Sequence, residues 1–183
     1  IIETDVTKNV LAEIRQQLQS SPGFNRQSWE QAAGYALNNG GDLNEALGWI
    51  NAAIEGQFFS QKSFANLSTK AQILERQGKT AEAKAVMDEA LSLASVFEVH
   101  AYGRQLIAQG KKEQALEVFK WNAKKHKGTW PVDFGLARGY SAVGNYKTAL
   151  KHLKIAEGRA PDAPNRNAIA AYIPKLEQGE DIN

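Results

Sequence analysis

The sequence contains no cysteine, a single methionine and only five prolines among its 183 residues. Without cysteine there is no disulfide, no thiolate ligand for zinc and no cysteine nucleophile. No apolar run reaches the roughly 18 to 20 residues that a membrane-spanning helix needs, so the sequence predicts no membrane span. The scarcity of proline, together with plentiful alanine, leucine, glutamine, lysine and glutamate, favours helices over strands.

A strong excess of either charge is also missing, because 22 basic and 20 acidic residues leave a formal net charge of +2. Residues 1–63 carry 4 basic and 7 acidic side chains, whereas residues 96–183 carry 14 and 9. This mild basic excess does not by itself indicate nucleic acid binding. The lysines of residues 111–127, near Trp121 and Trp130, could neutralise phosphates while the rings stack on bases. Lysines late in a helix more simply favour its negative end, so we do not expect nucleic acid as the partner.

Four similar stretches recur along the chain. Each has a glycine, then a polar or charged residue, and an alanine five positions after the glycine. The glycines lie 37, 32 and 34 residues apart, at Gly41, Gly78, Gly110 and Gly144. This period is typical of helical repeat arrays. We therefore predict four helix hairpins over residues 27–60, 64–97, 96–129 and 130–163, with each glycine as the left-handed residue that ends the leading helix.

Small residues recur where the two helices of a hairpin must approach each other closely. The leading helices place Gly34, Ala71, Gly103 and Ala137 there, and the second helices place Ala46, Ala83, Ala115 and Ala149. A helix over residues 5–19, capped by Thr4 or Asp5, precedes the repeats within a segment 1–26. A last helix at about 165–178, within the segment 164–183, is expected to seal the open end of the stack. Asp42 and Glu45 are expected to form a capping box.

The pattern of small, large, glycine and alanine residues over 27–163 resembles the tetratricopeptide-repeat (TPR) family. The resemblance implies an all-α fold, a right-handed α-solenoid of about four TPR helix hairpins with an N-terminal helix and a C-terminal capping helix. The sequence departs from the family where Trp29 is displaced by one place and Asn122 replaces an alanine. The closing proline is kept only as Pro161.

A second resemblance concerns residues 2–6 and 64–83. They are similar to the helical C-terminal region of an uncharacterised bacterial envelope protein family, which carries an upstream β-rich domain and usually an export signal. This resemblance implies a periplasmic or cell-envelope protein whose β-rich domain ends just before Ile1; a cytoplasmic location stays open.

The sequence shows no assembled catalytic or metal-binding set. His100, His126 and His152 lack the His-Glu-x-x-His spacing of a helical zinc site, and the last two are expected to be exposed. Residues 139–144 have the glycine spacing of a phosphate-binding loop, but Asn145 and Tyr146 follow instead of the required lysine and hydroxyl residue. We therefore expect no enzyme activity, no cofactor and no metal.

The resemblance to TPR proteins implies a concave groove lined by the leading helices. The positions that face a ligand in that family correspond here to Gln31, Tyr35, Asn38, Thr69, Gln72, Arg76, His100, Arg104, Phe134, Arg138, Tyr172 and Lys175. Arg104, Arg138 and His100 would make the C-terminal half cationic, which suits an acidic peptide or a chain terminus. The carboxylate clamp of chaperone-tail-binding relatives is not present, because its positions hold Gln31, Tyr35, Thr69, Phe97 and Ala101.

The preferred hypothesis is a non-catalytic protein- or peptide-binding repeat module. One alternative is that the groove residues are merely solvated and the repeats are a structural or dimerisation appendage, which exposed aromatics at Phe58, Phe59 or Trp130 would support. Another is an accessory region of an enzyme whose active site lies in a missing upstream domain.

Overall fold

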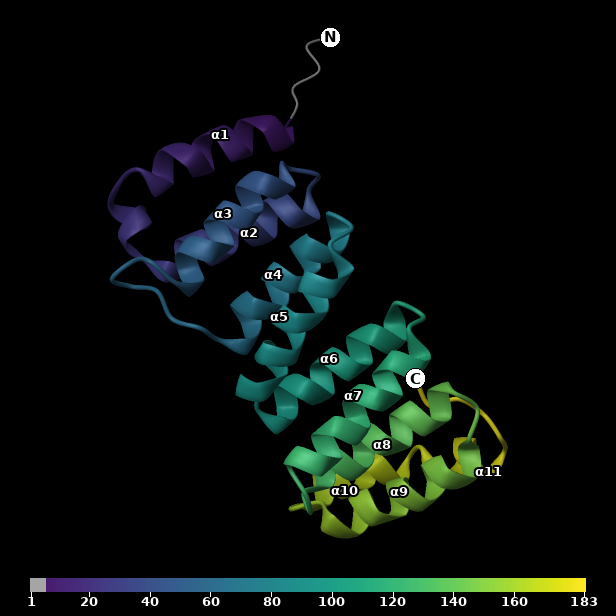
Figure 1. Cartoon of the computed structure of the whole chain (residues 1–183). Coiled ribbons are helices and arrows are strands. Elements are labelled where there is room, and N and C mark those ends of the chain that lie inside the picture. Colours follow the sequence, from purple (N-terminus) through teal and green to yellow (C-terminus); the bar gives the residue numbers. More distant parts are fainter. Residues whose placement is uncertain (1–5) are drawn as a thin grey trace. The chain divides into compact units, whose positions relative to one another are not determined.

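The computed structural model describes residues 6–183, and every regular element in this range is a helix (Figure 1). The all-α prediction is therefore confirmed. The expected caps Thr4 and Asp5 lie outside the described residues. The chain divides into two compact units, residues 1–93 and 94–183, and each is described by itself.

The N-terminal unit contains two helix hairpins preceded by a single helix. Its elements are α1 (Val6–Leu18), the short 3-10 helix η1 (Ser21–Phe24), α2 (Arg26–Asn38), α3 (Leu43–Ile54), α4 (Phe64–Arg76) and α5 (Thr80–Leu93). Helix α2 packs against α3, α4 against α5, and α3 also contacts α4 (Figure 1). Leu11 of α1 joins Leu37, Ile50, Leu67 and Ile73 in one buried cluster, so the first helix shares the core of the hairpins.

The C-terminal unit contains two further hairpins and a C-terminal pair of short helices. Its elements are α6 (Val96–Ala108), α7 (Lys112–Lys125), α8 (Trp130–Ala142), α9 (Tyr146–Arg159), α10 (Ala163–Ala170) and α11 (Ile173–Glu177). Helix α6 packs against α7 and α8, and α10 and α11 pack against α9. The prediction of one helix over about 165–178 is wrong. Pro174 has no N–H to donate to the carbonyl of Ala170 and its ring clashes with that carbonyl, so the helix breaks before it.

The turns inside the hairpins follow one pattern. Gly78, Gly110 and Gly144 have φ of 77°, 76° and 79°. In each case the next residue donates its N–H to a carbonyl five residues earlier, the bond of a Schellman motif.

The first hairpin corrects the prediction by one residue. Gly40, not Gly41, is left-handed, with φ of 74°. The Gly41 N–H donates to the Ala36 carbonyl at 2.8 Å, and a Cβ on Gly41 would lie 2.8 Å from the Ala36 Cβ. Both positions of this Gly-Gly pair therefore favour glycine, one for its φ and the other for a close approach.

The predicted alanines are all buried, at Ala46, Ala71, Ala83, Ala115, Ala137 and Ala149. Gly103 is buried as well, and a Cβ there would lie 2.5 Å from the Phe119 ring. The expectation for Gly34 is wrong: it is half-buried, and a Cβ built on it would meet nothing within 4 Å.

Polar residues fix several helix ends. Asp42 caps α3 by accepting from the Asn44 N–H at 2.7 Å, but the predicted capping box is wrong because Glu45 instead binds Arg15 of α1 at 2.6 and 2.7 Å. Capping boxes start α4 and α6. Asn122, where the repeat pattern expects alanine, is fully buried and donates to the Val96 carbonyl at 3.1 Å, so it ties α7 to the start of α6.

Candidate functional site

In the N-terminal unit the predicted groove residues are engaged in helix contacts to different degrees. They are Gln31, Tyr35, Asn38, Thr69, Gln72 and Arg76. Gln31 and Asn38 are exposed, whereas Tyr35 packs against the core. The Arg76 guanidinium donates to the Leu37 carbonyl at the end of α2. Arg76 therefore holds two leading helices together as well as carrying a charge.

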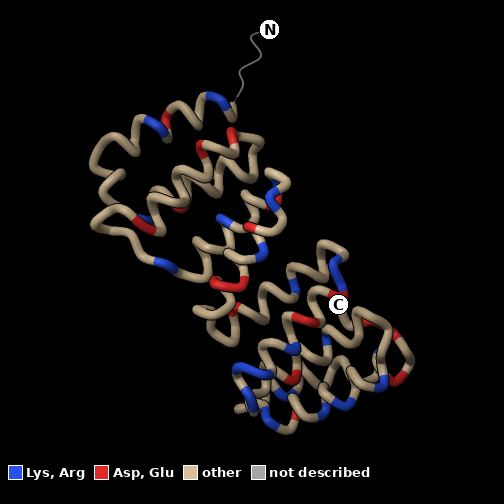
Figure 2. Tube along the Cα trace, in the orientation of Figure 1, with Lys and Arg blue, Asp and Glu red and all other residues tan. Residues whose placement is uncertain are grey.

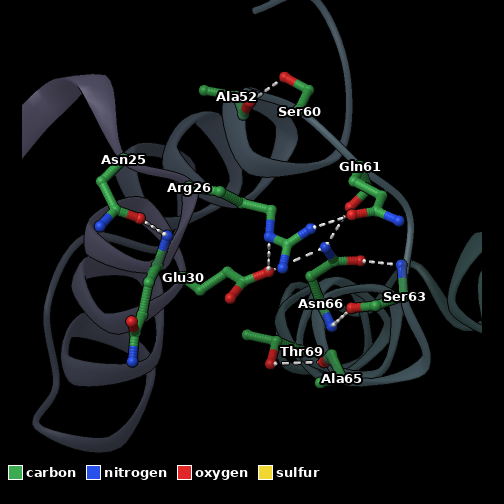
Figure 3. Close-up of polar contacts among 11 residues, drawn as sticks. Asn25, Arg26, Glu30, Ala52, Ser60, Gln61, Ser63, Ala65, Asn66 and Thr69 are labelled. Carbon is green, nitrogen blue, oxygen red and sulfur yellow. Dashed lines mark hydrogen bonds and ion pairs between the residues drawn. The ribbon is translucent and has the colours of Figure 1, made fainter. Parts of the chain in front are cut away.

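A polar junction of the same unit was missed by the sequence analysis (Figure 3). Asn66 is 1% exposed, and its amide nitrogen donates to Glu30 at 3.0 Å and to the Gln61 carbonyl at 2.8 Å. Its amide oxygen accepts from the Ser63 N–H at 2.9 Å. Arg26 donates to the Gln61 side chain at 2.7 Å and lies 3.3 Å from Glu30. Every polar atom of the Asn66 side chain has a partner, which indicates a structural role in holding the preceding loop to α2 and α4.

In the C-terminal unit the predicted residues come together in a row of aromatic and cationic side chains. We call this row the α6–α8 strip and define it as Phe97, His100, Arg104, Trp130, Phe134, Arg138 and Tyr172. Its rings form two groups: the centroids of Phe97 and Trp130 lie 6.5 Å apart, and the Phe134 centroid lies 5.7 Å from that of His100 and 5.8 Å from that of Tyr172. Residues four apart lie on the same face of a helix, which is why Trp130, Phe134 and Arg138 of α8 share this row.

The side chains of the strip differ in their exposure to solvent. Phe97 is 61% exposed and Arg104 is exposed, whereas His100, Trp130, Phe134 and Tyr172 are half-buried. Arg104 forms no ion pair with any residue in the range 6–183. Lys175, also predicted for the groove, is exposed on α11. The strip therefore offers a partner an accessible ring and an accessible charge beside partly covered aromatic surface.

Arg138 lies at the buried end of the strip and is only 8% exposed. Its guanidinium lies 4.7 Å from the Phe134 ring centroid and 5.2 Å from that of Tyr172. Burial lowers the pKa of Arg138, the nearby positive charge of Arg104 adds to this, and Tyr172 opposes it. The prediction that Arg138 freely faces a ligand needs correction, since the chain's own residues cover it.

The covering residues are 181–183. Arg138 donates to the Ile182 carbonyl at 3.3 Å and to the Asn183 side chain at 3.4 Å. One turn along α8, the Ser141 hydroxyl donates to Asp181 at 2.7 Å and accepts from the Ile182 N–H at 3.1 Å. Burial by itself raises the pKa of Asp181, but the hydrogen bonds from Ser141 and Asn183 and the charge of Lys112 lower it overall. The sequence held no local signal for this contact.

His100 does not add to the positive charge of the strip, contrary to expectation. Its Nδ1 lies 3.2 Å from the Pro131 carbonyl. Burial, with the positive charges of Arg138 and Arg104, lowers the pKa of His100 to about 4. The ring is therefore neutral near pH 7, and a neutral ring in this position donates from Nδ1 to the carbonyl.

The other two histidines are half-buried rather than exposed, contrary to prediction. His152 stacks on Tyr140 at 5.6 Å, and its Nδ1 lies 3.3 Å from the buried carboxylate of Asp133. Arg159 donates to the other oxygen of Asp133 at 2.5 Å. Both oxygens of Asp133 thus have partners from α9, and the group ties the start of α8 to α9.

No family model matches the chain, and a search of curated proteins found no match. Within residues 6–183 no helix combines the length and apolarity needed to cross a membrane. The same residues contain no cluster of three or more histidine, aspartate or glutamate side chains that could hold a metal ion.

Proposed function

We propose that this chain is a non-catalytic protein- or peptide-binding module. Its hairpins are proposed to be tetratricopeptide-type repeats, as in a right-handed α-solenoid, and its binding surface is the α6–α8 strip. The observation that carries the proposal is the pair of ring groups, Phe97 with Trp130 and Phe134 with His100 and Tyr172, together with the exposed cation of Arg104 and the buried cation of Arg138.

The residue types of the strip support binding rather than packing alone. Aromatic and arginine side chains are enriched among the residues that carry most of the energy of protein interfaces. Arg104 could bind a carboxylate through two parallel hydrogen bonds, and Phe97, two turns earlier on the same face of α6, offers a rigid, exposed apolar surface. The unit carries 14 basic and 9 acidic residues, distributed among all its helices (Figure 2). An acidic segment is therefore the favoured partner.

An array of immobilised peptides probed with the whole chain tests this proposal. We expect acidic peptides to be retained, and Arg104→Gln or Phe97→Ala to weaken their binding about tenfold, because truncating one of the few residues that dominate an interface costs more than about 1 kcal/mol and about 1.4 kcal/mol corresponds to tenfold. Lys151→Gln, a change of an exposed cation on α9, is the matched control and should leave binding unchanged. Arg138→Ala is unsuitable as the first test because the residue is buried.

Equal binding by the parent, Arg104→Gln and Phe97→Ala chains would show that the strip is not the binding surface. Retention of basic and acidic peptides alike would refute the preference for an acidic partner.

A second candidate function is self-association through the N-terminal unit. Phe58 is 81% exposed and Phe24 is 69% exposed, and their ring centroids lie 6.3 Å apart. Phe59, half-buried, joins them to Trp29. Exposed apolar clusters of this kind often mark interfaces. Light scattering over a range of concentrations tests this candidate: a dimer that Phe58→Ser dissociates would support it, and a monomer at every concentration would exclude it.

A further inference from the structure

The residues after α11 turn back onto α8. Gly179, with φ of 73°, ends α11, and the Glu180 N–H donates to the Lys175 carbonyl at 2.8 Å. Ile182 is then only 3% exposed, in the same apolar cluster as Ala137 and Leu176. Residues 181–183 are therefore a docked segment, which we call the C-terminal segment.

This segment satisfies the Arg138 guanidinium poorly. The acceptors are a carbonyl, a side-chain amide and the Tyr172 hydroxyl, at 3.3 to 3.4 Å. Hydrogen bonds from a guanidinium to a carboxylate are normally about 2.7 to 2.9 Å long and about twice as strong as neutral ones. The Arg138 Nε–H is buried and has no acceptor among residues 6–183. Among residues 6–183 no carboxylate forms an ion pair with Arg138: the negative charge of Asp181 is near enough to act on the guanidinium, but this carboxylate accepts from Ser141.

A buried cation without a directly bound anion is unfavourable, and the positive charge of Arg104 opposes it further, although the more distant Asp181 favours it. A carboxylate brought to Arg138 would bind the guanidinium directly and could accept from Nε, which has no acceptor among residues 6–183. The segment also shows the form that such a ligand would take. It has no regular secondary structure, with an acidic residue bound to Ser141 and an aliphatic residue in the apolar cluster.

Building on the proposed function, we propose that the C-terminal segment is a displaceable internal occupant of the Arg138 site. The partner is an extended acidic–aliphatic–acidic segment of another protein, which places its second carboxylate on Arg138. The partner reaches Arg138 only when the segment is undocked. The apparent affinity is therefore the intrinsic affinity multiplied by the fraction of chains whose segment is undocked. Arg138 thus determines the preference for a carboxylate, and the docked segment determines how much partner is needed for binding.

The test uses two labelled peptides with amidated C-termini that differ by one isosteric change, Gly-Glu-Asp-Ile-Glu and Gly-Glu-Asp-Ile-Gln, so that only the first carries a carboxylate at the last residue. They are titrated into the full chain and into two variants with a loosened segment, Ile182→Ser and a chain ending at Gly179. Ile182→Val, which keeps the apolar contact, is the matched control. Circular dichroism establishes that each variant keeps its helices.

We expect the loosened variants to bind the Glu peptide about tenfold more tightly than the Gln peptide, because only the former gives Arg138 a charged acceptor. They should also bind it about tenfold more tightly than the full chain or Ile182→Val. In the full chain, excess Glu peptide should shift the NMR amide signals of Ile182 and Asn183 as the segment leaves α8. This last measurement does not depend on the variants folding.

Equal affinity for the two peptides, or unmoved Ile182 and Asn183 signals at saturation, would overturn the proposal. Failure of the proposed function itself looks different, because no peptide binding would then depend on Phe97 and Arg104. Peptides whose binding depends on Phe97 and Arg104, but not on the C-terminal segment, would refute the internal occupant and leave the binding surface in place.

Discussion

Replacing Gly103 by alanine tests how α6, α7 and α8 pack around Phe119. The Phe119 side chain is fully buried, and a Cβ on Gly103 would lie 2.5 Å from two carbons of its ring. The ring has little room to move toward α8, because the α8 backbone lies so close to it that a Cβ built on Gly135 or Gly139 would be 2.6 or 2.8 Å from the ring. Alanine favours a helix over glycine by about 1 kcal/mol, whereas overpacking a core costs about 1–3 kcal/mol. Since two helices confine the ring, we take the upper end of this cost and expect a net loss of about 2 kcal/mol.

The free energy of unfolding is measured by urea denaturation followed by far-ultraviolet circular dichroism. Gly34→Ala is the matched control, because a Cβ there meets nothing within 4 Å and only the propensity gain of about 1 kcal/mol remains. The two glycine changes should thus have opposite signs. Combining Gly103→Ala with Phe119→Leu should be less damaging than the sum of the single changes, because the smaller side chain relieves the overlap. A Gly103→Ala chain as stable as its parent would refute this account of the packing.

Three further predictions concern polar groups. Asn66→Ala should lower the free energy of unfolding by about 3 kcal/mol, since three side-chain hydrogen bonds of about 1 kcal/mol each are lost. Urea denaturation measures this loss, with the mild change Thr69→Ala as the control. Equal losses of stability in the two variants would contradict the prediction. The pKa of His100 is about 4 in the fold and about 6.5 in the unfolded chain, so as pH falls from about 6.5 to 4 the unfolded chain takes up a proton first and stability decreases. His100→Gln should remove about 2–3 kcal/mol of that decrease, and an unchanged pH dependence would be inconsistent with a neutral buried ring. Asp133→Ala should cost about 1–3 kcal/mol in thermal unfolding, because Arg159 and His152 lose their common acceptor; Asp133→Asn, which keeps an acceptor, should cost less.

Much of the helical framework was predictable because the signals were local. Glycine followed by a polar residue and an alanine marks a turn within a few residues, and the recurring alanines lie on the buried faces. Errors arose where two neighbouring residues were equally suitable, as at Gly40 and Gly41, whose roles differ only in the backbone angle. The break in the final helix has a local cause, because Pro174 disfavours one continuous helix through its position and the prediction of a single helix did not take this into account.

The candidate site was harder to predict because its chemistry depends on residues far apart in the sequence. The pattern identified His100, Arg104, Phe134, Arg138 and Tyr172. It could not show that the ring of His100 loses its charge through burial. Nor could it show that residues more than 40 positions away in the sequence cover Arg138. The binding of a partner to these residues stays a prediction.

The docking of the C-terminal segment has a practical consequence for experiments. The Asn183 side chain accepts a hydrogen bond from the Arg138 guanidinium, so residues joined after Asn183, such as an affinity tag, would begin directly after a residue that contacts Arg138. A histidine tag or a charged linker attached there would sit next to the surface that a binding assay is meant to probe. Fusions and surface-immobilisation handles for this chain therefore belong on the side of Ile1.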